Sequence, residues 1–318
     1  MDLWRRAADP WNQDVLIGVS WDLMWAAIIV AAAFLVGHAV WIKTRPSEAH
    51  EVTEVPAGIP ERIQRHSLAS RVFHWTMSAS MLVLLVTAFV PVLGLQFAWV
   101  EIHWIAGVVL TATIIYHIIH SIGWQDFWSM FQIGFSEGVA HLKHIMSPKA
   151  PAPKAGKYPF DHRMFHHTNV VVGLGVIATG VLMMVRIDTP LWAPNPYMLA
   201  DSTWGVVYVI HGLCGVLLIL LTASHIYFAL RPEKMWITWS MIRGWVDRDH
   251  YLAHHDPAKW VVTNGAAPPS VTEGTPRAAE TAEAEGASPE ARSASELRRA
   301  GRGPSPKARP ALLSLPQE

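Results

Sequence analysis

Two histidines, His211 and His225, lie fourteen residues apart within a single apolar stretch of the sequence. An ionisable side chain is costly in hydrocarbon, so a histidine at membrane depth indicates a functional role. Fourteen residues advance a helix by about 1400° and about 21 Å, which places both rings on nearly the same face, one near each membrane surface. A face of this kind can hold two stacked cofactors. We expect haem, because imidazole is a common axial ligand of haem iron.

The composition is that of a membrane protein. The chain has 318 residues, of which 51% are hydrophobic and 16% are charged. Its apolar residues gather in five runs long enough to cross a bilayer as helices, near residues 15–42, 70–93, 101–122, 166–185 and 204–230. The first run is too long and begins too late for a cleavable signal peptide. Because lipid admits only helices or closed barrels, we predict an all-α membrane protein: a four-helix transmembrane haem-binding bundle plus one extra N-terminal transmembrane helix.

Lysine and arginine are distributed unevenly among the segments between these runs. Residues 43–71, 123–165 and 231–259 carry five each, whereas residues 94–100 carry none and residues 186–203 carry one. The positive-inside rule therefore places the basic segments and the C-terminus in the cytoplasm, and the N-terminus outside. We expect a multi-pass protein of the bacterial inner (cytoplasmic) membrane, in contact with the lipid bilayer and with no nucleic-acid partner.

The remaining segments define the predicted domain organisation. We divide the chain into an N-terminal membrane helix, a cytoplasmic connector, a dihaem core and a C-terminal tail, at residues 1–45, 46–65, 66–248 and 256–318. The stretch 125–146 mixes aromatic and polar residues and is expected to form an amphipathic helix on the inner surface. The tail has few aromatic residues and cannot bury enough apolar surface to fold alone, so we expect it to be disordered.

The depth of each histidine sorts the candidate ligands. Two haems with both axial positions filled need four imidazoles, arranged as two level pairs. His103 and His211 both fall in the outer half of the membrane and form one pair. His225 falls in the inner half, where its partner is either His74 or His117, because His117 also lies fourteen residues after His103. The second ring nitrogen of each ligand should be hydrogen-bonded to a carbonyl or a side chain, which orients the ring.

Small residues beside these histidines support a flat cofactor. Gly107 and Gly215 each follow a histidine of the outer pair by four residues. Residues four apart share a helix face, so each glycine leaves room for the haem macrocycle. The chain has no CxxCH motif, which excludes covalent haem attachment of the c type. The histidines at 250, 254 and 255 are expected to be solvated or at headgroup level.

Three segments carry a resemblance to a known family. RVFHW at residues 71–75 opens one span, HWIAG at residues 103–107 opens the next, and His211 and His225 share the last. Over residues 62–246 the chain resembles the dihaem cytochrome b subunits of membrane-bound formate dehydrogenases (the gamma subunit) and of nickel–iron hydrogenases, and it is bacterial cytochrome b561-like. The resemblance implies two haem b groups as cofactors.

The resemblance also implies an assignment of ligands. It implies His103 and His211 on the iron of the outer haem, and His74 and His225 on the iron of the inner haem. It thereby favours His74 over His117 as the inner ligand. It further implies a quinone site at the inner surface, beside the inner haem.

The implied quinone site is matched only in part. In the formate dehydrogenase relatives a segment resembling KYNAGQK precedes the third helix of the core, and here residues 157–163 read KYPFDHR. Only the first two positions match. The residues that we take as candidates for the quinone site are Tyr158, Asp161, His162 and His166. We hypothesise that one of Asp161, His162, His166 or His167 handles the quinone proton.

The function expected from these features is electron transfer. Electrons would pass between a redox partner subunit at the outer face, the two haems, and a membrane quinone near the inner surface. The partner would be an iron–sulfur, molybdenum or multihaem protein. One alternative is a stand-alone cytochrome b561-type quinone oxidoreductase. Another is a haem-free membrane anchor or transporter, whose histidines relay protons.

Overall fold

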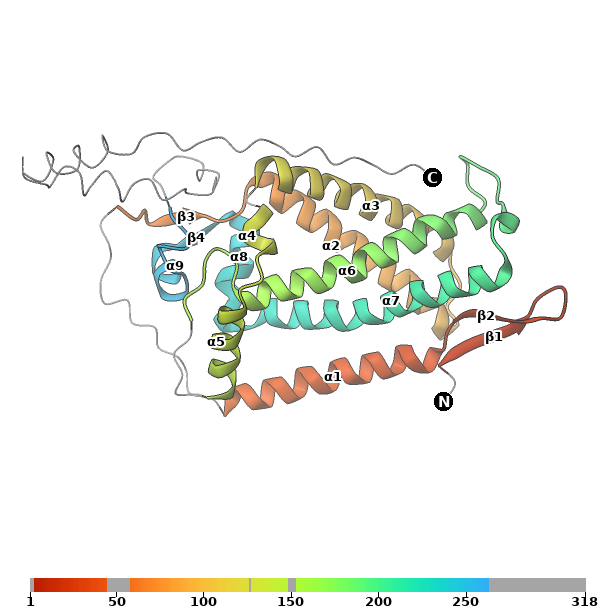
Figure 1. Ribbon diagram of the computed structural model, residues 1–318, viewed down its shortest axis with the longest axis horizontal. Helices are drawn as coiled ribbons and strands as arrows, with labels where there is room; N and C mark the ends of the chain where they lie inside the picture. Colours follow the sequence, from red (N-terminus) through yellow and green to blue (C-terminus); the bar gives the residue numbers. More distant parts are fainter. Residues whose placement is uncertain (1–2, 45–57, 126, 148–152, 263–318) are drawn as a thin grey trace, which may run out of the picture. The chain divides into compact units, whose positions relative to one another are not determined.

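The computed structural model describes residues 3–44, 58–125, 127–147 and 153–262 (Figure 1). In these ranges five helices are long and apolar enough to cross a membrane. They are α1 (Trp21–Lys43), α2 (Leu68–Phe89), α3 (Trp99–Trp124), α6 (Phe160–Met183) and α7 (Asp201–Leu230). The 3-10 turns η1 (Val90–Leu93) and η2 (Met184–Arg186) extend α2 and α6. The predicted fold class, a helical multi-pass membrane protein, is confirmed.

Two of the spans begin away from their predicted starts. α1 begins at Trp21 rather than at residue 15, because residues 14–19 form a strand and Ser20 caps the helix by accepting a hydrogen bond from the Leu23 N–H at 3.4 Å. α6 begins at Phe160, six residues before the predicted start at 166. Its first turns are polar, so hydropathy did not reveal them as helix.

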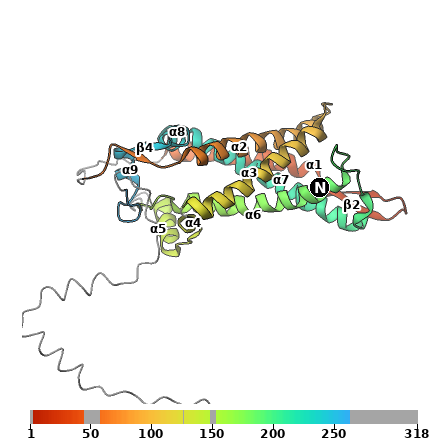
Figure 2. The ribbon, with the colours of Figure 1, turned by 90° about the horizontal axis from the view of Figure 1, so that it is seen from above.

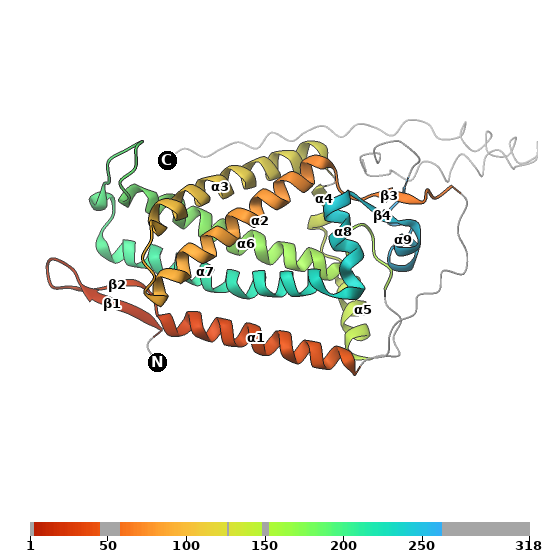
Figure 3. The ribbon, with the colours of Figure 1, turned by 180° about the vertical axis from the view of Figure 1, so that it is seen from behind.

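The four helices α2, α3, α6 and α7 form a bundle (Figures 1 and 3). α2 packs against α3, α6 against α7, and α3 against α6, while α1 packs against α7 from outside. The contact of α1 with α7 includes a polar pair in an aromatic setting. His38 Nδ1 lies 3.0 Å from the Tyr227 hydroxyl, and the rings of Phe34, Trp41 and Phe228 surround the imidazole.

An N-terminal hairpin, which the sequence analysis did not predict, lies against one end of α7. β1 (Trp4–Ala8) pairs antiparallel with β2 (Asp14–Val19). Two glycines of α7 permit the contact, because a Cβ added at Gly205 would lie 2.5 Å from the Leu16 carbonyl oxygen and one added at Gly212 would lie 2.8 Å from Val19. We call this end of the bundle the hairpin end.

The opposite end carries a small folded element that we call the cap (Figure 2). The cap consists of β3 (Arg62–Gln64), the 3-10 turn η4 (Pro232–Lys234), α8 (Met235–Arg243), β4 (Trp245–Asp247), α9 (Arg248–His254) and residues 255–262. β3 and β4 pair antiparallel. Its apolar core is Ile63, Val246, Tyr251 and Leu252, against which Trp236, Trp260 and Val262 pack.

The cap corrects two predicted boundaries. The tail does not begin at 256, because Trp260 and Val262 pack on the cap core; residues 263–318 of the predicted tail lie outside the described residues. The connector predicted at 46–65 includes β3, and its residues 46–57 lie outside the described ranges. The predicted amphipathic stretch forms α4 (Phe127–Phe131) and α5 (Phe135–Met146), at the same end as the cap (Figure 2).

Gly244 joins the start of α2 to the cap. It ends α8 with a positive φ of 94°, and its carbonyl oxygen accepts hydrogen bonds from the N–H groups of Arg65 at 2.8 Å and His66 at 3.0 Å. A Cβ at this position would lie 2.9 Å from the His66 carbonyl oxygen. Only glycine combines that conformation with such a close approach, and the contact directs Arg65 into the cap.

Candidate functional site

Two pairs of histidines face each other inside the bundle, one toward each end. His103 of α3 and His211 of α7 form the hairpin-end pair, with ring centroids 6.3 Å apart. His74 of α2 and His225 of α7 form the cap-end pair, also with centroids 6.3 Å apart. α7 therefore supplies one imidazole at each level, as the fourteen-residue spacing predicts.

The separation within each pair matches two imidazoles on one metal ion. A bond between a metal and an imidazole nitrogen is about 2 Å long, and that nitrogen lies about 1 Å from the ring centroid. Two imidazoles on opposite sides of one metal therefore have centroids about 6 Å apart. Both pairs have this separation, so the four histidines fit two irons with bis-imidazole ligation.

Two threonines orient the hairpin-end pair. Thr87 Oγ1 lies 2.8 Å from His103 Nδ1, and Thr179 Oγ1 lies 3.0 Å from His211 Nδ1. Each hydroxyl also donates to a carbonyl oxygen of its own helix, on Val83 at 2.8 Å and Gly175 at 2.7 Å. Because a hydroxyl has a single proton, each threonine accepts from an Nδ1–H group. That tautomer leaves the Nε2 lone pair of both histidines available for iron.

The cap-end pair is held differently. His74 Nδ1 is buried and has no hydrogen-bond partner among the described residues, so the expectation of a bonded second nitrogen is wrong for this ring. Aromatic packing supports the pair instead. Phe165 stacks on His225 at 5.4 Å with an interplanar angle of 14°, and Trp75 lies edge-on to His74 at 5.3 Å.

Gly107 and Gly215 are not tightly packed by the protein. A Cβ added at either glycine would meet one atom at 3.9 Å, on Leu84 and Phe89 respectively. Protein packing therefore does not require glycine at these positions, in contrast to the two glycines of α7 under the hairpin. This loose packing agrees with the predicted room for a flat cofactor next to the hairpin-end pair.

His117 does not face His225. Its ring lies 6.4 Å from that of His166 on α6 and 4.3 Å from Phe73, and its Nδ1 lies 3.2 Å from the Ser121 hydroxyl. The structure thus brings His74, and not His117, opposite His225.

The candidate quinone residues lie at the cap end but are not all gathered together. His166 faces Phe131 at 5.7 Å, and His167 Nδ1 contacts a carbonyl oxygen of its own helix. His162 lies one turn before His166, where Arg65, Lys234 and His225 act on it electrostatically. Asp161 is exposed in the first turn of α6. Tyr158 precedes the helix and has Lys157 Nζ 5.5 Å from its ring centre.

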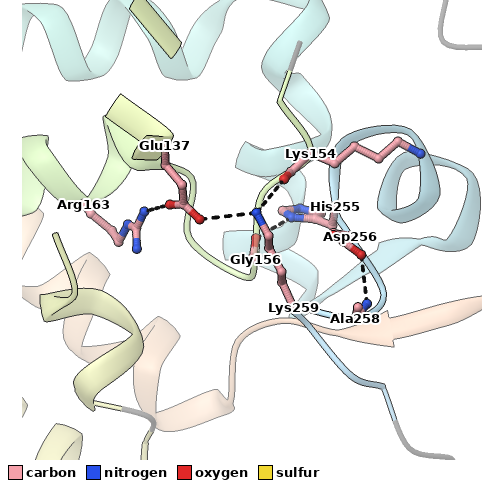
Figure 4. A network of polar contacts seen from close by, with 8 residues as sticks. All are labelled: Glu137, Lys154, Gly156, Arg163, His255, Asp256, Ala258 and Lys259. Carbon is pink, nitrogen blue, oxygen red and sulfur yellow. Dashed lines mark hydrogen bonds and ion pairs between the residues drawn. The ribbon is translucent and has the colours of Figure 1, made fainter. Parts of the chain in front are cut away.

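A polar network ties this end of the bundle to the cap (Figure 4). Glu137 of α5 forms ion pairs with Arg163 of α6 and, at 3.3 Å, with Lys259. Lys259 Nζ also donates to the Lys154 carbonyl oxygen at 3.5 Å. Burial raises the pKa of Glu137, but the hydrogen bond and charge of Arg163 outweigh it, and the net pKa is below its usual range.

The sequence analysis missed several residues that shape the site. Thr87 and Thr179 lack any local signal, because each meets its histidine only after the helices have packed. Gly180 was also missed; a Cβ there would lie 3.3 Å from the His211 ring. The solvated placement expected for His255 is wrong. This side chain is 1% exposed, and its Nδ1–H donates to the Gly156 carbonyl oxygen at 2.7 Å.

The chain was compared with known protein families and with curated proteins. The model of a family described as prokaryotic cytochrome b561 matches residues 65–244. The matched range contains α2, α3, α6 and α7 and both histidine pairs, and it excludes α1 and the hairpin. No curated protein matches the chain.

Proposed function

Because the chain belongs to the prokaryotic cytochrome b561 family, we propose that it is an electron-transfer subunit that carries two haem b groups, one at each end of its bundle. Membership of this family makes the chain a membrane-bound b-type cytochrome and contradicts the haem-free alternative. The two-haem count rests on one observation: two histidine pairs with the same centroid separation of 6.3 Å.

We assign the residues of the chain separate roles in binding the two haems. Haem, when bound, supplies one-electron redox chemistry. His103 and His211 would hold one iron. Thr87 and Thr179 would accept hydrogen bonds from the Nδ1–H groups of these histidines, which leaves the Nε2 lone pairs of the histidines free for the iron. His74 and His225 would hold the other. The rise of about 21 Å between the two histidines of α7 sets the distance between the two levels.

We place the cap end on the cytoplasmic side and the quinone site there. The cap and the segments next to it carry the excess of lysine and arginine, which favours the cytoplasm. His162 and His166 lie at this level. His225 is an electrostatic neighbour of His162, and the ring of His166 lies against those of Phe131 and His117. We assign His162 and His166 the handling of the quinone proton, with Tyr158 and Asp161 at the mouth of the site.

A redox partner subunit would then exchange electrons at the hairpin end. The resemblance to subunits of hydrogenases and formate dehydrogenases supports an iron–sulfur, molybdenum or multihaem partner. The alternative is a stand-alone cytochrome b561-type quinone oxidoreductase, which needs no partner subunit. Purification in mild detergent separates the two, because only the first predicts a co-purifying redox protein.

The two-haem proposal is tested by a pyridine haemochrome assay on the purified full chain. We expect two b haems per chain and two steps in a redox titration. A single haem per chain, or a c-type spectrum, would contradict the proposal. Unchanged quinone turnover after simultaneous replacement of Asp161, His162, His166 and His167 would remove the assigned proton role.

A further inference from the structure

Arg65 is a buried cation whose hydrogen-bond partners are neutral. Its side chain is 4% exposed. Nη1 donates to His255 Nε2 at 3.1 Å and Nη2 donates to the Lys157 carbonyl oxygen at 3.2 Å, while Nε has no partner. His255 must accept this bond, since its Nδ1–H already donates to Gly156 (Figure 4). No carboxylate among the described residues pairs with the guanidinium, so its charge is not neutralised within them.

The surrounding rings do not compensate for this charge. Trp236 and Trp260 lie 5.9 and 5.6 Å from the guanidinium carbon, near the outer limit of cation–π attraction. Cation–π attraction at these distances is weak, whereas removing an ion from water is costly. Burial lowers the pKa of Arg65 to about 10, which reflects the same imbalance. A buried cation of this kind requires an anion, and the described residues do not supply one.

Further positive groups lie near His66 and His162. The electrostatic neighbours of His66 are Arg65, Lys157, Arg71 and His74. Those of His162 include Arg65, Lys234 and His225, with Asp161 as the carboxylate among them. Two further guanidinium nitrogens near α2 and α6, Arg71 Nε and Arg163 Nε, are also buried without partners. We call Arg65, Arg71, Lys157 and Lys234 the basic cluster.

We propose that the basic cluster is a carboxylate-binding site that takes the propionate groups of the haem held by His74 and His225. The inference rests on the proposed function, because it presupposes haem at the cap-end pair. Haem b carries two propionates, each an anionic carboxylate at one edge of the macrocycle. Charge-assisted hydrogen bonds from arginine are the strongest that a carboxylate can receive. The cluster therefore has the charge and the donors that the propionates need, and Arg65 gains the anion that it lacks.

The test is a double-substitution cycle on the full chain, purified from haem-deficient cells and placed in zwitterionic lipid nanodiscs. Haem and haem dimethyl ester, whose propionates cannot ionise, are titrated into a His103→Leu background that retains only the cap-end pair. We expect Arg65→Gln to weaken haem binding about tenfold and to leave ester binding unchanged. Equal weakening for haem and ester overturns the proposal.

Controls separate this effect from loss of folding. In a His74→Leu background, which retains only the hairpin-end pair, Arg65→Gln should change haem binding less than about twofold. Arg62 is an exposed arginine of β3, three residues before Arg65, and Arg62→Gln should have no effect in either background. If Arg65→Gln disrupts the hairpin-end haem as well, Lys157→Gln replaces it. That variant keeps the backbone carbonyl that Arg65 uses, and it should weaken haem but not ester binding.

A lipid phosphate has the same anionic oxygen chemistry and is distinguished by a second arm. If a lipid headgroup occupies the cluster, the effect of Arg65→Gln appears only in nanodiscs of anionic lipid and is the same for haem and ester, which overturns the propionate assignment. Failure of the proposed function looks different, because neither background then binds haem. If both backgrounds bind haem and Arg65→Gln has the same effect in each, the propionate assignment is wrong while the two-haem proposal stands.

Discussion

The two histidine pairs have the same separation but different surroundings, and the difference shows which parts of a cofactor site the bundle fixes. At the hairpin end, Thr87 and Thr179 bond both Nδ1 atoms, and glycines border the space beside the rings. At the cap end, His74 Nδ1 has no partner among the described residues, and aromatic rings pack against the pair. Helix α7 and the helices facing it thus set the separation of the two rings in each pair. The hydrogen-bond partners and the packing around the rings differ between the two ends.

The largest effect expected is the loss of one haem without the other. His103→Leu should abolish the hairpin-end haem and keep the cap-end haem, and His74→Leu should do the reverse, because each iron loses one of two ligands. A haemochrome assay should give one haem per chain in each case. His117→Leu is the matched control, and loss of a haem in that variant would overturn the assignment of pairs.

A bulky residue beside the hairpin-end pair should prevent haem binding at that end only. Gly107→Leu would place a side chain in the space next to His103, so that the hairpin-end haem is excluded while the cap-end haem stays bound. Redox titration of the variant should show a single step. Gly37→Leu on α1 is the control, since a Cβ there meets nothing within 4 Å and α1 lies outside the four-helix bundle. Two steps in the Gly107 variant would contradict the predicted placement.

Removal of the threonine hydroxyls should affect the hairpin end alone. Hydrogen-bond partners of metal-bound histidines typically contribute about 10–100-fold to affinity. Thr87→Val and Thr179→Val should each weaken the hairpin-end haem within this range, measured by haem titration in a background that lacks the cap-end pair. Thr113→Val provides the control, because its hydroxyl bonds only to the Val109 carbonyl oxygen of its own helix, at 2.7 Å. An equal effect on the cap-end haem, measured in the His103→Leu background, would show that the hydroxyls act on folding instead.

The smallest effect expected is a pH dependence confined to the cap. Burial and the charge of Arg65 lower the pKa of His255 to about 3, and burial with the same charge lowers that of His66 to about 2. Both values lie below the usual value of about 6.5, so the unfolded cap binds more protons as the pH falls. The stability of the cap is therefore complete above about pH 6.5 and is lost progressively toward pH 3.

This dependence can be followed by tryptophan fluorescence, because Trp236 and Trp260 border Arg65 and His255. His255→Asn should reduce the slope of cap stability against pH by about one proton. The hairpin-end haem should show no change over the same range. A slope that is unchanged in the variant would indicate that His255 is not the group that titrates.

The sequence predicted those features that depend on local period, and missed those that depend on packing. Hydropathy and the fourteen-residue spacing on α7, which a helix converts directly into two levels on one face, predicted the pair His103 and His211 and placed His225 at the other level. They left His74 and His117 open as its partner, and only the family resemblance favoured His74. The hairpin was missed because its strands are short and lack a clear alternation. Thr87 and its partner His103 lie on different helices, so their contact depends on how α2 and α3 pack together.

The buried contact between Arg65 and His255 shows the same limit more strongly. These residues are 190 positions apart, and nothing near either of them in the sequence indicates that they meet. Histidines near a terminus ordinarily lie in solvent, so the cap had to be seen before His255 could be placed. The ion pairs of Glu137 with Arg163 and Lys259 belong to the same class of long-range contact.

The position of α1 has a consequence for how the protein is made. During synthesis α1 and β2 leave the ribosome well before α7, which begins at residue 201, yet both pack against that helix. Their docking surface does not exist until α7 has been synthesised. The N-terminal helix must therefore wait in the bilayer as a separate span while the other helices are inserted. It closes on the bundle last, when glycines 205 and 212 become available to the hairpin.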